Sequence, residues 1–218
     1  MILEDKMGNY LRTDILEEGI RSLEFICERL DLVLEDTYQW KWIIIGTDNA
    51  LQNFMVAALR DSVGYNILHA KIRKKWWNAF LKEKKRPEEK LDGFLNLYSG
   101  IQSSQMKNYF GSKPFIPNQV QDSSIKKLHE LRNKFIHFIP KGWSLEVSGL
   151  PDIITRCIEI IDYLVNESGN ILFYEEMHDN RYHLVVKKIK GKINNMMELY
   201  KTNEMTPSMA NMGVGNID

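Results

Sequence analysis

Apolar residues recur every three or four positions along most of the chain. The spacing is regular from Asp14 to Leu34 and again from Gln39 to Leu59, which predicts two long amphipathic helices. No segment of useful length alternates apolar and polar residues in the way that a half-buried strand does. The pattern therefore predicts an all-α protein.

The same periodicity predicts five further helices. They are expected at residues 71–85, 91–102, 122–138, 150–165 and 179–200. Pro87 and Pro140 are expected to end the first and the third of these, because a proline lacks the amide hydrogen and clashes with the preceding turn. Asp122 or Ser123 is the expected N-cap of the third, since short polar side chains accept hydrogen bonds from the free amides of a first turn.

Composition indicates one globular domain. The chain has 218 residues, of which 44% are hydrophobic and 27% charged, as is typical of a folded globule. We expect an antiparallel helical bundle of about six to seven helices formed by residues 1–201. Residues 202–218 are rich in Met, Asn and Gly, and there we expect a flexible C-terminal tail.

Charge is balanced overall but unevenly distributed. The 29 basic residues match the 29 acidic ones in number. Residues 1–36 hold ten acids against four bases, whereas residues 71–90 hold nine bases against three acids. The basic segment also contains Trp76 and Trp77, a combination that can bind a phosphate backbone and stack bases. The alternative is a solvated helix face whose tryptophans belong to the core.

Several classes of protein are disfavoured by what the sequence lacks. Its two cysteines, Cys27 and Cys157, cannot form a disulfide scaffold or a zinc cage on their own. His178 and His183 are five residues apart and point roughly 140° apart on a helix, so we expect surface histidines and no metal site. No Gly-rich phosphate loop is present, and no cofactor is expected. The opening residues, MILED, do not resemble a signal peptide, and no apolar run approaches the roughly 20 residues that span a bilayer, so a cytoplasmic protein without membrane contact is expected.

One predicted helix has polar side chains where apolar ones are expected. On a helical wheel of residues 125–140, Arg132 falls inside the apolar arc, while His129, Asn133 and His137 follow one border of it. An arginine keeps its charge when it is buried. Arg132 must therefore meet a carboxylate, a group of carbonyls, another subunit or an anionic ligand.

The purely structural interpretation is an ion pair inside the bundle. Asp48 also lies on an apolar helix face, four residues after Ile44 and three before Leu51, and it is a candidate partner of Arg132. In that interpretation His137 lies at the helix end because the helix dipole favours it there.

The segment Arg132-Asn133-Lys134-Phe135-Ile136-His137 resembles the motif of the HEPN superfamily. In that motif an arginine, often followed by a polar residue, precedes a histidine by four to six intervening residues. HEPN domains are small all-α bundles with the motif near the end of a late helix, and the resemblance covers about residues 10–200. Many members are metal-independent endoribonucleases that dimerise so that two motifs face one cleft, whereas others only bind or signal.

The resemblance implies a homodimeric endoribonuclease that cleaves RNA by attack of its own 2′-hydroxyl. His137 would transfer protons, since imidazoles do so near neutral pH. Arg132 would bind the phosphate oxygens, and Asn133 would position the histidine or the phosphate. A role in host defence or as a toxin, with a possible antitoxin partner, comes from the resemblance alone.

Basic residues near the motif and in the basic segment are candidate RNA contacts. They are Lys74, Lys75, Lys134 and Lys141. Two alternatives to the nuclease remain open. One is a non-catalytic HEPN-type module that binds nucleotide or RNA through Arg132, and the other is an interaction protein in which Arg132 only forms a buried ion pair.

Overall fold

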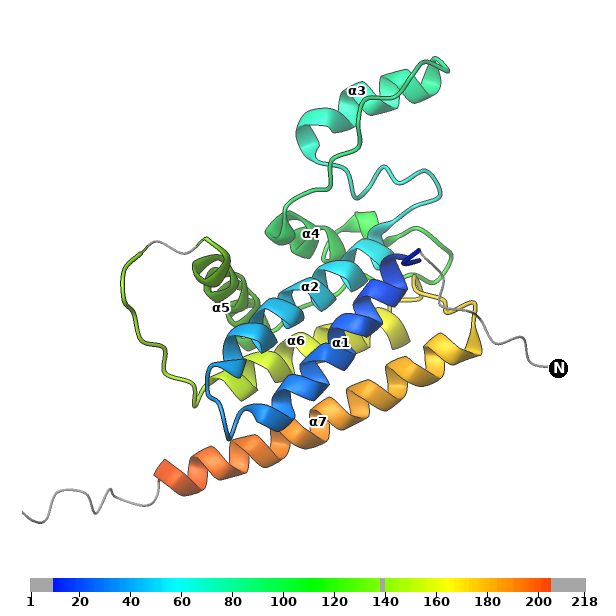
Figure 1. The fold of residues 1–218 in the computed structure, drawn as a ribbon. Helices are drawn as coiled ribbons and strands as arrows, with labels where there is room; N and C mark the ends of the chain where they lie inside the picture. The colour runs from blue at the N-terminus through cyan, green and yellow to red at the C-terminus, as the bar shows by residue number, and fades with distance from the viewer. Residues whose placement is uncertain (1–9, 138–139, 205–218) are drawn as a thin grey trace, which may run out of the picture.

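The chain folds as a bundle of helices (Figure 1). The computed structural model describes residues 10–137 and 140–204, and within these ranges it contains seven α-helices, one short 3₁₀ helix and no strands. The helices are α1 (Ile15–Leu32), α2 (Gln39–Leu59), α3 (Ala70–Leu81), α4 (Phe94–Ile101), η1 (Ser104–Met106), α5 (Gln119–Ile136), α6 (Leu150–Asn166) and α7 (Glu176–Glu204). The predicted all-α helical bundle is therefore confirmed.

Helix α2 is the central element of the bundle. It packs against α1, α4, α5 and α6, while α7 lies along α1 and α6 (Figure 1). Trp40, Phe54 and Leu59 are among its fully buried side chains. The helix is apolar around most of its circumference, which is typical of a helix enclosed by others. Asp48, in the middle of α2, is consequently held inside the bundle.

An ion-pair network joins α1 to α7. Arg181 of α7 donates to Glu17 over 2.7 Å and to Glu24 over 2.9 Å. Arg21 pairs with the same two carboxylates. The hydrogen bonds from Arg181 are the main cause that lowers the pKa of both glutamates below its ordinary value. His178, expected on the surface, is instead mostly buried against Glu17, with 3.2 Å between Nε2 and Oε2.

Residues 60–93, called the arm below, project from the bundle and contain α3 (Figure 1). The predicted helix 71–85 is shorter than expected and ends at Leu81, well before Pro87. The chain turns at Glu83, which adopts φ 51°, and the amide of Lys84 donates to the carbonyl of Ala79 over 2.9 Å. This closure of the last turn, not the proline, ends the helix.

Helix α5 begins at Gln119, earlier than predicted. The expected N-caps Asp122 and Ser123 lie inside the helix, and Asn118 is the N-cap. The side chain of Asn118 accepts a hydrogen bond from the amide of Gln121 over 2.9 Å, and the Gln121 side chain accepts one from the amide of Asn118 over 3.1 Å. This capping box satisfies two free amides and fixes the start of the helix.

Three further helix ends differ from the predicted ones. Helix α5 ends at Ile136 with His137 as its C-cap, and residues 138–139 lie outside the described residues. Helix α4 begins at Phe94, because Leu91 pairs with Leu68 in an isolated antiparallel bridge. Helix α7 continues to Glu204, so the first residues of the predicted flexible tail are helical, whereas residues 205–218 lie outside the described residues.

None of the helices in the described part of the chain combines the length and the apolar character that crossing a bilayer requires.

Candidate functional site

Asp48 contacts two side chains of α5 from the centre of α2. Its Oδ1 lies 3.3 Å from Nε of Arg132, and its Oδ2 lies 2.9 Å from Nδ1 of His129. His129 and Arg132 are neighbours on the helix surface because they are three residues apart. One buried carboxylate, 2% exposed, therefore binds both side chains, and the ion pair considered from the sequence is present.

Opposing effects act on the charge of Asp48. Burial has the largest influence and raises the pKa of its carboxyl above the ordinary value, while the hydrogen bond with His129 and the charges of His129 and Arg132 lower it. The His129 ring is itself stacked on Phe94 of α4, with 4.5 Å between ring centroids and 3° between planes. The carboxylate and the ring are thus held by three helices.

The guanidinium of Arg132 is accessible on its outer side. Its side chain is 32% exposed, less than the water-facing lysines of the same helix, as the wheel predicts. Those lysines are Lys126 at 62%, Lys127 at 47% and Lys134 at 51%. Nε faces Asp48 and Nη1 donates to Oδ1 of Asn133 over 3.1 Å, whereas Nη2 has no partner among the described residues. Three of the five guanidinium N–H groups, one on Nη1 and two on Nη2, therefore remain for an anion.

A cavity of about 430 Å³ opens between α1, α2 and α5, with Arg132 and Asp48 in its wall. Its size is within the range of small-molecule pockets. The remaining wall residues are Arg21, Ser22, Phe25, Trp42, Ile45, Gly46, Asn49 and Gln52. Phe25 and Trp42 are 38% and 41% exposed, so neither side chain is fully covered by the bundle. The wall combines aromatic surface, side-chain amides and two guanidinium groups.

His137 and Asn133 are placed differently from Arg132. His137 is exposed at the end of α5, and neither it nor Asn133 is in the wall of the cavity. The amide of His137 donates to the carbonyl of Asn133 over 2.9 Å, and its backbone leaves the helix with φ −101° and ψ 57°. The Asn133 side chain accepts from Arg132 and makes no hydrogen bond to the imidazole. The fold of one chain thus brings Arg132, Asn133 and Asp48 together and leaves His137 at the surface.

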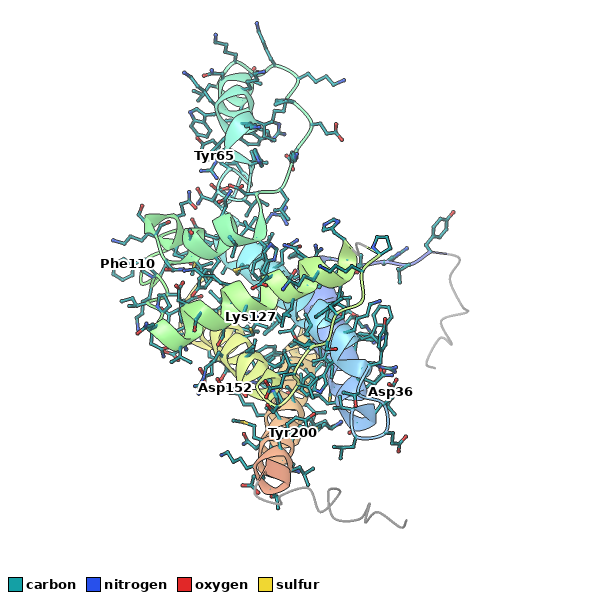
Figure 2. All side chains as sticks on the ribbon, turned by 90° about the vertical axis from the view of Figure 1, so that its left-hand side faces the viewer. Asp36, Tyr65, Phe110, Lys127, Asp152 and Tyr200 are labelled. Carbon is teal, nitrogen blue, oxygen red and sulfur yellow. The ribbon has the colours of Figure 1, made fainter. Side chains whose placement is uncertain are left out.

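The four candidate lysines do not gather around Arg132. Lys74 and Lys75 are exposed on α3, in the arm. Figure 2 shows that the arm, marked by Tyr65, lies beyond α4 as seen from α5. Lys134 forms an ion pair with Glu130, with 2.6 Å between Nζ and Oε1. Lys141 is exposed in the link between α5 and α6.

Histidine, cysteine and carboxylate side chains are the groups of this chain that could hold a metal ion. Among residues 10–137 and 140–204, no three His, Cys, Asp or Glu side chains are grouped so that they could hold a metal ion. His183 is half-exposed and pairs with Asp179, with 3.3 Å between Nε2 and Oδ1. Cys27 and Cys157 are buried free thiols, and burial raises the pKa of the Cys157 thiol.

No protein-family model, curated protein or solved structure matches this chain. A function for this chain therefore rests on the chemistry of its own residues and not on a relative.

His129 is the residue of the site to which the sequence pattern gave no role. Its position on the border of the apolar arc, one turn before Arg132, was a usable signal, because both side chains point toward the same neighbouring helix. Its stacking on Phe94 could not be read from the pattern, since Phe94 belongs to another helix.

Proposed function

We propose that this chain is a metal-independent endoribonuclease of the HEPN type. The observation that supports the proposal is how the contacts of the Arg132 guanidinium are divided between Asp48 and the cavity. Its Nε is held by the buried carboxylate of Asp48, and three of its N–H groups have no hydrogen-bond partner among the described residues. Arg132 also belongs to the wall of a cavity that contains two aromatic residues. Planar guanidinium groups match the geometry of phosphate oxygens, and aromatic rings stack on bases. A nucleotide fits both features, with its phosphate beside Arg132 and its base against an aromatic ring.

The proposed reaction is transesterification within the RNA. The 2′-oxygen forms a bond to phosphorus while the bond from phosphorus to the 5′-oxygen breaks. An imidazole accepts the proton of the 2′-hydroxyl, and a protonated imidazole donates a proton to the leaving 5′-oxygen. His137 is the proposed proton carrier, and Arg132 stabilises the additional negative charge on the phosphorane. The products are a 2′,3′-cyclic phosphate and a free 5′-hydroxyl.

Asp48 and His129 act in this proposal as positioning residues. Asp48 fixes the direction of Nε of Arg132, and the stacked ring of His129 fixes the second carboxylate oxygen. A guanidinium held in this way loses little freedom when phosphate binds, which is how preorganised donors increase rates.

A homodimer completes the proposed site. His137 is exposed and outside the cavity that contains Arg132, so one chain alone does not unite the acid–base group with the phosphate-binding group. In a two-fold dimer the ends of two α5 helices approach each other, and two imidazoles serve one cleft as base and acid. The same proposal includes cytoplasmic RNA as the substrate. It also includes a toxin or defence role with an antitoxin partner, and these parts rest on the likeness of the motif.

The second candidate is a non-catalytic module that binds nucleotide or RNA, or a partner protein. The Asp48–Arg132 ion pair favours it, because a guanidinium with a buried partner also has a structural role. In this case the cavity would still bind nucleotide, and the protein would be stabilised against heat by nucleotide without cleaving RNA.

The deciding experiment is incubation of the purified protein with single-stranded RNA in excess EDTA, followed by analysis of the new ends. The nuclease proposal expects 2′,3′-cyclic phosphate and 5′-hydroxyl ends, together with a dimer by light scattering. RNA that stays intact while nucleotide raises the melting temperature would favour the second candidate. Cleavage that depends on added Mg²⁺ would contradict the metal-independent mechanism and point to a contaminating nuclease.

A further inference from the structure

Helix α3 presents a continuous basic stripe to the solvent. Its lysines lie three, four and eleven residues after Lys71, and at 100° per residue they fall within an arc of about 100°. The stripe consists of Lys71, Lys74, Lys75, Asn78 and the C-cap residue Lys82, all of which are exposed. It extends for about 16 Å along the helix at 1.5 Å per residue.

None of the lysines in this stripe forms an ion pair within the described part of the chain. The basic residues of the arm that do have partners point elsewhere. Arg73 binds the carbonyl of Leu68 over 2.8 Å, and Arg86 lies over the ring of Trp76 at 5.2 Å from its centroid. Unpaired, fully hydrated charge on one face is available to a polyanion.

The arm has a small core that holds α3 in place. Trp76 is fully buried, and its ring is stacked on Phe80 with 5.5 Å between centroids. The amide of His69 donates to the carbonyl of Lys90 over 2.8 Å, which closes the arm at its base. The stripe is therefore presented by a packed element.

We propose that the α3 stripe binds the sugar–phosphate backbone of single-stranded RNA, as a surface separate from the Arg132 site. The lysines supply positive charge at helical intervals without a fixed geometry, which suits backbone binding without sequence recognition. Trp77, 38% exposed, borders the stripe next to Lys74. Its ring is stacked on Phe80 with 5.5 Å between centroids and meets Tyr65 edge-on, so a base would contact the part of the ring that these neighbours leave exposed. This inference rests on the proposed function for its ligand class, and it assigns the arm to affinity and Arg132 to chemistry.

An acidic protein surface is the competing occupant, although several acidic side chains of this chain are already paired within it. The acidic segment of the chain lies in and around α1. Glu17 and Glu24 are paired with Arg181, and Asp31 is paired with Lys192. These carboxylates are used within the chain, whereas Glu35 and Asp36 are exposed and form no ion pair among the described residues. The poly-glutamate measurement below therefore separates an acidic protein surface from RNA.

The test measures binding of a fluorescent 2′-O-methyl RNA oligomer, which cannot be cleaved because the attacking hydroxyl is blocked. The full chain is compared with Lys74→Gln/Lys75→Gln and with the control Lys187→Gln/Lys188→Gln on α7. The control lysines are also exposed and unpaired among the described residues, and both variants lose the same charge. Loss of two backbone contacts should lower the slope of log K against log salt by about 1.4, which is about 20-fold weaker binding at 0.1 M salt.

The outcomes separate this inference from the proposed function. Weaker binding and a smaller salt slope in the α3 variant alone support it. Equal binding by both variants overturns it, and so does preferential binding of poly-glutamate over the oligomer. Cleavage of unmodified RNA is measured on the same samples, so a chain that cuts RNA without using the stripe refutes the arm's role and leaves the nuclease intact.

Discussion

Oδ1 of Asp48 lies 3.3 Å from Nε of Arg132 and joins the centre of α2 to the last turns of α5. The carboxylate is buried, whereas the guanidinium remains 32% exposed. The pair explains why an arginine occupies the apolar arc of α5, and it leaves three N–H groups of that arginine without a hydrogen-bond partner among the described residues. A structural and a ligand-binding role are thus compatible in one residue, and they can be separated by mutation.

Replacing Arg132 by methionine should affect stability and activity together. Asp48 would then keep only His129 as a partner, and we expect a loss of about 1–3 kcal/mol in the free energy of unfolding. RNA cleavage should fall by about 10²–10³-fold, because the phosphorane loses its planar donor. Urea unfolding and an initial-rate assay measure the two effects.

Two other variants serve as comparisons for Arg132→Met. Lys127→Met changes an exposed residue of the same helix whose ion pair with Glu130 is at the surface, so its stability should change by less than about 1 kcal/mol. Arg132→Lys keeps the charge without the planar fork. Full activity in Arg132→Lys would show that the geometry of the guanidinium is not needed.

Comparison with Asp48→Asn should show whether ionisation of Asp48 stabilises or destabilises the folded chain. Burial raises the pKa of this carboxyl above its ordinary value of 3.8, so in that pH range the folded state binds more protons than the unfolded one. The free energy of unfolding of the native chain should therefore fall, relative to that of Asp48→Asn, as pH rises from about 4 toward neutral. Urea unfolding of both chains at several pH values measures the difference. A relative gain in stability with rising pH would mean that His129 and Arg132 outweigh burial.

Arg181→Met should destabilise the chain at neutral pH and leave it less sensitive to acid. Arg181 lowers the pKa of Glu17 and Glu24 below the ordinary 4.5, so the stability that these carboxylates provide is present above that value and is lost as pH falls. We expect a loss of about 1–2 kcal/mol at pH 7, since the groups are partly exposed. As pH falls through the lowered pKa of these carboxylates, the native chain and the variant should converge. A constant difference across pH would exclude the ion pairs as its cause.

The bundle could be predicted because helical periodicity is a local property of the sequence. The bounds of α2, at Gln39 and Leu59, follow directly from its apolar pattern. Helix ends were less predictable, because they depend on particular contacts. The capping box of Asn118 lies one turn before the expected start of α5, and α3 ends where Glu83, a non-glycine residue, adopts a positive φ.

The site could be predicted only in part. The wheel identified Arg132 as misplaced, and Asp48 followed because it is a carboxylate on an apolar face. The stacking of His129 on Phe94 depends on how α4 packs against α5, and the projection of α3 depends on the closure of the arm at residues 69 and 90. Neither has a signature in local spacing. The separation of Lys74 and Lys75 from Arg132 is likewise a tertiary property.

The most direct test of the proposed chemistry is the rate of RNA cleavage in EDTA by His137→Ala and by His183→Ala. Both side chains are exposed, so both variants should melt within about 2 °C of the native chain. We predict that His137→Ala loses about 10²–10⁴-fold in rate, as expected for removal of a proton-transfer group, while His183→Ala cuts RNA at the native rate. Equal cleavage by the two variants would contradict the assignment of His137 as the acid–base residue.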